Sequence, residues 1–119
     1  MADDVLINKA AAIERAVARA REIHGGDDRH LTENQTTQDA IILNLQRACE
    51  SSIDAAMHLV RVHRLGVPQH TREAFQMLEA AGRITPDLAA RLQRMVGFRN
   101  IAIHEYQRLD VAIVRAIVV

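Results

Sequence analysis

Apolar residues spaced three and four apart recur along most of this chain and constrain its fold more than any other feature. One apolar stripe covers residues 6–24, and a longer one covers residues 40–65. This spacing places the apolar side chains on one face of an α-helix. Since a helix with one apolar face buries it against another helix, the sequence predicts an all-α fold.

Glycines and polar residues set the bounds of the first two predicted helices. The glycine pair at 25–26 ends the first helix, and the polar segment that continues to about Gln35 is predicted to be a loop with some local order. Thr36 or Thr37 offers a hydroxyl to cap the second helix, which is predicted to continue to Leu65. These two helices account for the first half of the chain.

Two further helices are predicted in the second half. A short helix around Phe75 is expected to end near Gly82. The segment 85–87, Thr-Pro-Asp, is the clearest helix start, because it combines a hydroxyl cap, a proline at the first helical position and a carboxylate in the first turn. Gly97 predicts a bend or a close approach in the fourth helix. We therefore expect an up-and-down bundle of four or five helices.

The overall composition fits one small domain. A chain of 119 residues suits a single unit over residues 1–119, and the aromatic content of 3% favours helices over sheets. Cys49 is the only cysteine, so an oxidising compartment gains no support and a cytoplasmic location is expected. The N-terminus is acidic, unlike a signal peptide, and no apolar run approaches the roughly 20 residues that span a bilayer. We expect neither secretion nor membrane insertion.

The C-terminal segment is almost wholly apolar and ends without a polar tail. Two explanations stay open. Either Ile113, Ile117 and Val118 are buried by another part of the fold or by another subunit, or the native protein continues beyond Val119. The sequence favours the second explanation, so we expect the domain to be truncated at its C-terminus.

One short segment of the fourth helix holds the strongest candidates for a functional site. Arg99, Asn100, His104 and Tyr106 fall within eight residues, at Arg-x4-His-x-Tyr spacing. Arginine holds phosphate, and imidazole moves protons near neutral pH. The net charge of zero argues against a non-specific nucleic-acid coat, but residues 83–119 carry six basic and three acidic side chains. This pattern predicts a site that cleaves phosphodiesters.

The chemistry expected of this segment uses side chains alone. His104 would take the proton from an RNA 2′-hydroxyl, Arg99 would hold the phosphate and offset its growing charge, and Asn100 would orient the imidazole or the substrate. No cofactor is required. The sequence offers no metal-ligand pattern either, because His58 and His63 are five residues apart rather than four.

Helical geometry limits how this site can form. Asn100 and His104 share one helix face, whereas Arg99 and His104 lie about 140° apart on an ideal helix. Three arrangements can bring them to one phosphate: a bend near Gly97, the reach of the arginine side chain, or a two-fold dimer that sets two copies of the helix across a cleft.

Each of these residues also has a purely structural interpretation. Arg99 could pair with a carboxylate, and Tyr106 could cover a hydrophobic edge. A single histidine on a helix is more often packed or solvent-exposed than catalytic. We assign such structural roles to the remaining histidines, which are His24, His30, His58, His63 and His70.

The motif and its surroundings resemble a known family. Residues 95–106, followed by Leu109-Asp110, are similar to the signature of the HepT-like toxins of the HEPN superfamily. The resemblance continues upstream through the long second helix, the turn at 66–68, the helix at 73–75 and the segment 84–86. It therefore covers most of the chain from about residue 35.

This resemblance implies a helical homodimer with the motif at the dimer cleft, acting as a metal-independent ribonuclease toxin of a type VII toxin–antitoxin system on tRNA or mRNA. The implied partner is a minimal nucleotidyltransferase (MNT) antitoxin, which inactivates the toxin by transferring AMP to Tyr106. Arg99 and His104 would be catalytic and Asn100 supporting. Family members often continue through a further C-terminal helix, which this chain lacks after Val119.

A second function uses the same fold and motif without catalysis. The chain would then be a binding subunit that presents a nucleotide or substrate to a nucleotidyltransferase, with Arg99 holding phosphate and His104 transferring no proton. Growth arrest that depends on Arg99 would favour the enzyme, whereas loss of partner binding without arrest would favour the binding subunit.

Overall fold

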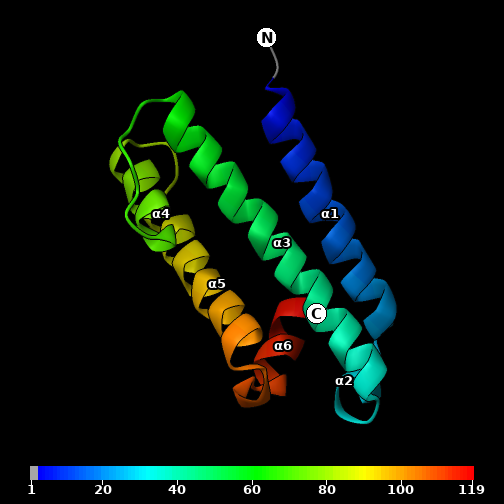
Figure 1. Ribbon diagram of the computed structural model, residues 1–119. Coiled ribbons are helices and arrows are strands. Elements are labelled where there is room, and N and C mark those ends of the chain that lie inside the picture. The colour runs from blue at the N-terminus through cyan, green and yellow to red at the C-terminus, as the bar shows by residue number, and fades with distance from the viewer. Residues whose placement is uncertain (1–2) are drawn as a thin grey trace.

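The computed structural model describes residues 3–119, and its regular structure there is helical. The elements are α1 (Asp4–His24), α2 (Arg29–Thr32), α3 (Gln35–Val62), α4 (Thr71–Ala80), α5 (Pro86–His104), the 3-10 helix η1 (Tyr106–Arg108) and α6 (Val111–Val118). In Figure 1, α3 lies between α1 and α5, α4 lies beside the start of α5, and α6 crosses the other end of the molecule. The predicted all-α bundle is confirmed.

The helices α1 and α3 form the most extensive pair. The side chain of Asp3 caps α1, and its Oδ2 lies 2.6 Å from His58 Nε2 near the end of α3. Gly25 ends α1 in the left-handed conformation, with φ of 58°, which glycine adopts without a steric penalty. The predicted end of the first helix is therefore confirmed, and so is a structural role for His58.

The segment predicted as a loop with some local order contains the one-turn helix α2. The cap of the next helix was assigned to the wrong residue, because Asn34, rather than Thr36 or Thr37, caps α3. Its Oδ1 accepts a hydrogen bond from the Thr37 backbone at 3.2 Å. The Thr37 hydroxyl instead donates to the His30 carbonyl at 2.6 Å and ties α3 back to α2.

The long helix also ends earlier than predicted. It stops at Val62 rather than Leu65, since Arg64 adopts a positive φ of 54° and breaks the helical path. Leu65 still points toward the core and packs against the buried cluster around Phe75. The apolar spacing thus extends three residues beyond the end of the helix, which is why the predicted helix was too long.

The start of α5 follows the prediction closely. Thr85 Oγ1 accepts from the Leu88 backbone at 3.2 Å, and Pro86 is the first helical residue. Helix α5 continues through Gly97 to His104. A Cβ atom at Gly97 would lie 3.0 Å from Arg72 Nη2 on α4, so the glycine admits a close approach, which was one of the two predicted alternatives.

Two buried clusters form the core. One lies where α1, α2, α3, α5 and α6 meet and includes Ile41, Phe98 and Val114. The other joins α3, α4 and α5 and includes Phe75 and Val96. Because both clusters use α3 and α5, the relative position of these two helices is set along most of their length.

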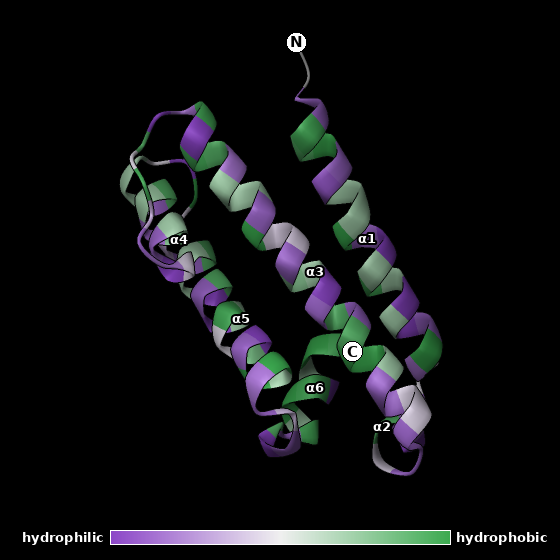
Figure 2. Ribbon diagram, viewed as in Figure 1, coloured by the Kyte–Doolittle hydropathy of each residue, from purple (hydrophilic) through white to green (hydrophobic). Residues whose placement is uncertain are grey.

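The apolar C-terminal segment divides between burial and exposure. In Figure 2, the ribbon of α6 has the colour of hydrophobic residues along most of its length. Val114 and Val118 are fully buried, but Ile113 and Ile117 are 53% and 43% exposed and line a groove with α1, α3 and α5. Burial within the fold therefore accounts for Val118 and not for the two isoleucines. None of the helices within residues 3–119 is long and apolar enough to cross a membrane.

Polar contacts fix α6 to the first half of the chain. Arg115 Nε donates to Asp28 Oδ2 at 2.7 Å, and the other oxygen of this carboxylate lies 2.9 Å from His24 Nε2. These contacts hold the pKa of Asp28 below its usual value, through Arg115 first and His24 second. The residues after the motif are thereby fixed to the end of α1 and to the turn between α1 and α2.

Candidate active site

The end of α5 divides the motif between two elements. Arg99 and Asn100 lie within the helix, His104 is its last residue, and Tyr106 is the first residue of η1. The Glu105 backbone donates to the Ile101 carbonyl at 2.8 Å and closes the last helical turn. The chain therefore changes direction between His104 and Tyr106.

Arg99 is held by two other helices. Its Nη1 donates to Glu50 Oε1 of α3 at 3.0 Å, and its Nη2 donates to Thr71 Oγ1 at the start of α4 at 3.4 Å. The Arg99 side chain is only 17% exposed. Packing and two polar partners therefore fix the position of the guanidinium.

One N–H group of the Arg99 guanidinium has no hydrogen-bond acceptor among residues 3–119. Within the described part of the chain, Arg99 Nε is buried and has no hydrogen-bond partner. Its carboxylate partner, Glu50, is 41% exposed, so solvent weakens the attraction between them. A phosphate with two negative oxygens could compete for the same donors.

His104 has a different environment. Its side chain is exposed, and within residues 3–119 it takes part in no hydrogen bond or ion pair that the structure shows. Asn100, one turn earlier on the same face, is half-buried. Within one chain, no polar contact joins Arg99 to His104, as the predicted separation of about 140° requires.

Tyr106 is anchored to α3. Its hydroxyl donates to Asp39 Oδ1, a contact between residues far apart in the sequence. Burial first, and the Asp39 carboxylate second, raise the pKa of Tyr106 well above its usual value. The phenol is therefore neutral and directed at a carboxylate.

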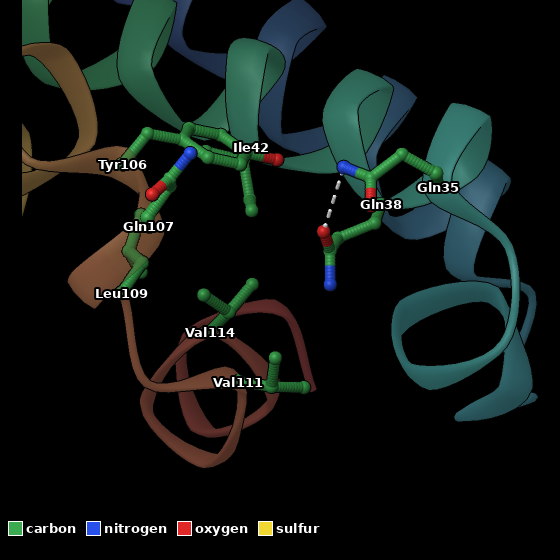
Figure 3. Close-up of a pocket in the computed structure, with 8 residues that line it drawn as sticks. All are labelled: Gln35, Gln38, Ile42, Tyr106, Gln107, Leu109, Val111 and Val114. Carbon is green, nitrogen blue, oxygen red and sulfur yellow. Dashed lines mark hydrogen bonds between the residues drawn. The ribbon is translucent and has the colours of Figure 1, made fainter.

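A pocket of about 540 Å³ lies next to Tyr106. Figure 3 shows side chains of α3, η1 and α6 arranged around it, with the Tyr106 ring along one side. Its lining residues carry no formal charge and are Gln35, Gln38, Ile42, Tyr106, Gln107, Leu109, Val111 and Val114. An apolar base with amide groups at the rim suits a flat, neutral ring better than a phosphate.

Sequence reasoning did not identify the partners of the motif, namely Glu50, Thr71 and Asp39. One sequence signal was available, because Asp39 and Glu50 are 11 residues apart and so share a face of α3 to within about 20°. Each of these carboxylates holds one motif residue. Helix α3 thus contacts both ends of the motif.

Among the described residues, neither a group of metal ligands nor an accessible thiol lies near the motif. Within the described residues, no three His, Cys, Asp or Glu side chains are grouped to hold a metal ion. Cys49 is buried, and burial raises the pKa of its thiol to about 11.

Comparisons with known proteins agree with the resemblance inferred from the motif. The family model described as ribonuclease HepT-like matches residues 13–119. The chain is 45% identical over 112 residues to the mRNA nuclease HepT of Shewanella oneidensis, an alignment that covers 94% of this chain and 84% of that protein.

Solved structures of toxin–antitoxin pairs have the same fold. A tri-AMPylated Shewanella oneidensis HEPN toxin in complex with MNT antitoxin matches with a TM-score of 0.92 and 44% identity, over 98% of this chain and 87% of that chain. A toxin–antitoxin crystal structure with AMP-PNP matches with a TM-score of 0.91 and 43% identity, over the same shares of the two chains. With its motif, fold and sequence all in agreement, the chain belongs to the ribonuclease HepT-like family.

Proposed function

We propose that this protein is a ribonuclease toxin that cleaves RNA without a metal ion and is neutralised by AMP transfer to Tyr106. The observation that carries the proposal is the contrast within the motif. Arg99 is fixed by Glu50 and Thr71, while His104 is exposed and unpaired among the described residues. A fixed cation and an available imidazole are what phosphodiester cleavage needs.

In this mechanism the RNA supplies its own nucleophile. His104 takes the proton from a 2′-hydroxyl, whose oxygen then attacks the adjacent phosphorus. Arg99 offsets the negative charge that grows on the phosphate oxygens, and Asn100 orients the imidazole or the substrate. The relative named as an mRNA nuclease favours mRNA as the substrate, with tRNA as the other candidate.

We propose a homodimer as the form that completes the site. Arg99 and His104 diverge by about 140° on one helix, α5 continues through Gly97, and Glu50 and Thr71 hold the Arg99 side chain. Of the three arrangements considered, these observations favour a second copy that brings an arginine and a histidine to one phosphate. The last turn of α5 also exposes Ile101 and Ile103, which are 39% and 41% accessible. A partner surface would cover these apolar side chains beside His104.

Neutralisation is proposed to follow from charge and bulk. An AMP group on Tyr106 would place a negative phosphate two residues from His104, where RNA phosphate should bind. Support comes from the relative whose structure is a tri-AMPylated toxin with its MNT antitoxin. By analogy, we expect this chain to bind an MNT antitoxin in the cytoplasm.

The test is cleavage of a mixed mRNA and tRNA pool by the purified, unmodified protein in excess EDTA. We expect the native chain to cleave and His104→Ala to be slower by at least about 100-fold. His63→Ala is the matched control, since His63 lies at the far end of α3 and should keep full activity. Unmodified Tyr106 is verified by intact mass.

Two results would contradict the proposal. Equal cleavage by the native chain and His104→Ala would remove the histidine from the mechanism. An unmodified dimer that cleaves nothing would favour the non-catalytic binding subunit instead.

A further inference from the structure

We propose that Asp39 is the proton acceptor for AMP transfer to Tyr106. This inference rests on the proposed function, because it assumes that Tyr106 is the residue that receives AMP. It goes further by assigning a role in the transfer to the toxin's own side chains.

The geometry around the Tyr106 hydroxyl points to this role. The phenol donates its hydrogen directly to Asp39 Oδ1. The same oxygen accepts from Gln35 Nε2 at 2.7 Å, so a second bond fixes the carboxylate. All three residues are near the start of α3 or in η1, and the acceptor is carried by a long, packed helix.

Other ionisable groups near Tyr106 are directed elsewhere. Glu105 pairs with Arg108 at 3.2 Å, and Asp110 accepts from the Ala112 backbone at the start of α6. His104 is exposed on the last turn of α5. On the pocket side, the lining residues from α3, η1 and α6 carry no charge. Within residues 3–119, Asp39 is thus the ionisable group in contact with the phenolic oxygen.

The transfer can be written with Asp39 in this role. The Tyr106 oxygen attacks the α-phosphorus of ATP, and a new oxygen–phosphorus bond forms. As it forms, the phenolic O–H bond breaks and its proton moves to Asp39. The bond from the α-phosphorus to the bridging oxygen breaks, and pyrophosphate leaves with the electron pair. No oxidant or further co-reactant is needed.

A direct acceptor matters because this phenol resists ionisation. Burial and the nearby carboxylate both raise the pKa of Tyr106, so hydroxide in solution removes its proton poorly. A carboxylate already hydrogen-bonded to the phenol can accept the proton as the phosphorus bond forms. The same contact that keeps the phenol neutral at rest therefore makes it reactive during transfer.

The experiment measures the initial rate at which a purified MNT antitoxin transfers label from α-phosphate-labelled Mg-ATP to this chain. We expect Asp39→Asn to be slower by at least tenfold at pH 7. Its rate should rise steadily toward pH 9, as solvent takes over from the missing carboxylate, whereas the native rate should level off. Asp39→Glu, which keeps a carboxylate, should recover much of the rate.

Asp54→Asn is the matched control, because it makes the same change on the same helix, where Asp54 accepts from Lys9 alone among residues 3–119. It should stay within twofold of the native chain. Tyr106→Phe should accept no label. Thermal unfolding verifies that each variant is folded, and if Asp39→Asn is not, the comparison of Asp39→Glu with Asp39→Ser replaces it.

The outcomes separate the two proposals. A native chain that takes no label, or a Tyr106→Phe variant that is labelled normally, would overturn Tyr106 as the AMP acceptor. A native chain labelled on Tyr106, with Asp39→Asn equal to it in rate and pH profile, would overturn the role of Asp39 alone.

Discussion

Arg99 and His104 are five residues apart on one helix, yet the structure treats them in opposite ways. The Arg99 guanidinium is packed against α3 and α4 and fixed by Glu50 and Thr71. The His104 imidazole lies exposed on the last turn of α5. One chain therefore positions the group proposed to hold the phosphate, whereas the group proposed to move protons would be positioned by RNA or by a second subunit. Because only Arg99 is packed and bonded within the described fold, we expect Arg99 to affect both stability and activity and His104 to affect activity alone.

The most direct way to test this contrast is to remove each side chain in turn. Arg99→Ala and His104→Ala should both reduce RNA cleavage by at least about 100-fold. Only Arg99→Ala should lower the free energy of unfolding, by about 1 to 2 kcal/mol, because it removes a buried, hydrogen-bonded group. His104→Ala should stay within about 0.5 kcal/mol of the native chain in urea unfolding. Equal stability losses would show that the two residues are not held differently.

The Glu50 contact tests whether fixing Arg99 matters for catalysis. Glu50→Gln keeps the shape of the side chain but loses its charge, so the guanidinium should adopt more orientations. We expect kcat to fall by about tenfold with little change in KM, which corresponds to about 1.4 kcal/mol of transition-state stabilisation. Glu14→Gln, an exposed change on α1, is the control and should have no effect. A rise in KM alone would mean that Glu50 acts only on substrate binding.

A substitution at Gly97 tests how closely α5 and α4 must approach each other beside Arg99. An alanine there would bring its Cβ within 3.0 Å of Arg72 Nη2, the mobile end of a long side chain. Arg72 should move slightly, and the helix should gain up to about 1 kcal/mol from losing a glycine. We expect a small rise in Tm with cleavage within about threefold of native. A clear fall in Tm would show that Arg72 cannot move away.

The Asp28 contacts test whether the way α6 is held supports the fold rather than the site. Asp28→Asn removes the carboxylate that joins Arg115 and His24, and we expect a lower Tm at pH 7 with nearly native cleavage. Because the pKa of Asp28 is lowered in the folded state, its contribution is present above the unfolded value of 3.8 and lost as the pH falls through the folded value. The Tm difference between variant and native chain should therefore shrink as the pH falls below 3.8 and disappear once the pH is below the folded pKa. A difference that persists in acid would assign the effect to packing.

Local sequence signals predicted the helices that have unambiguous ends. The left-handed Gly25 and the Thr85–Pro86 start are clear signals, and both were located correctly. The cap of α3 was not, because it is predicted at Thr36 or Thr37, whereas Asn34 caps the helix and the Thr37 hydroxyl donates to the His30 carbonyl of α2. The local sequence shows which residues are able to cap a helix, but contacts with other helices decide which of them does so.

The sequence shows that Asp39 and Glu50 share a face of α3, but it does not show which residue each one contacts. Helix α3 carries Asp39, Glu50 and Asp54, which all resemble solvent-exposed carboxylates in sequence. In the structure, each binds a different residue: Tyr106, Arg99 and Lys9. Which carboxylate meets which partner depends on the register between α3 and its neighbours, and that register is set by the buried clusters rather than by the polar residues themselves.

The 11-residue interval between Asp39 and Glu50 has a consequence for how this protein can change over time. Inserting or deleting one residue between them would turn one carboxylate by about 100° around α3 and break its contact with either Tyr106 or Arg99. The length of α3 between the two carboxylates thus fixes the spacing between the arginine proposed to hold RNA phosphate and the tyrosine proposed to accept AMP. Lineages should accumulate substitutions in this interval while keeping its length constant, since a change of length would separate the toxin from its means of control.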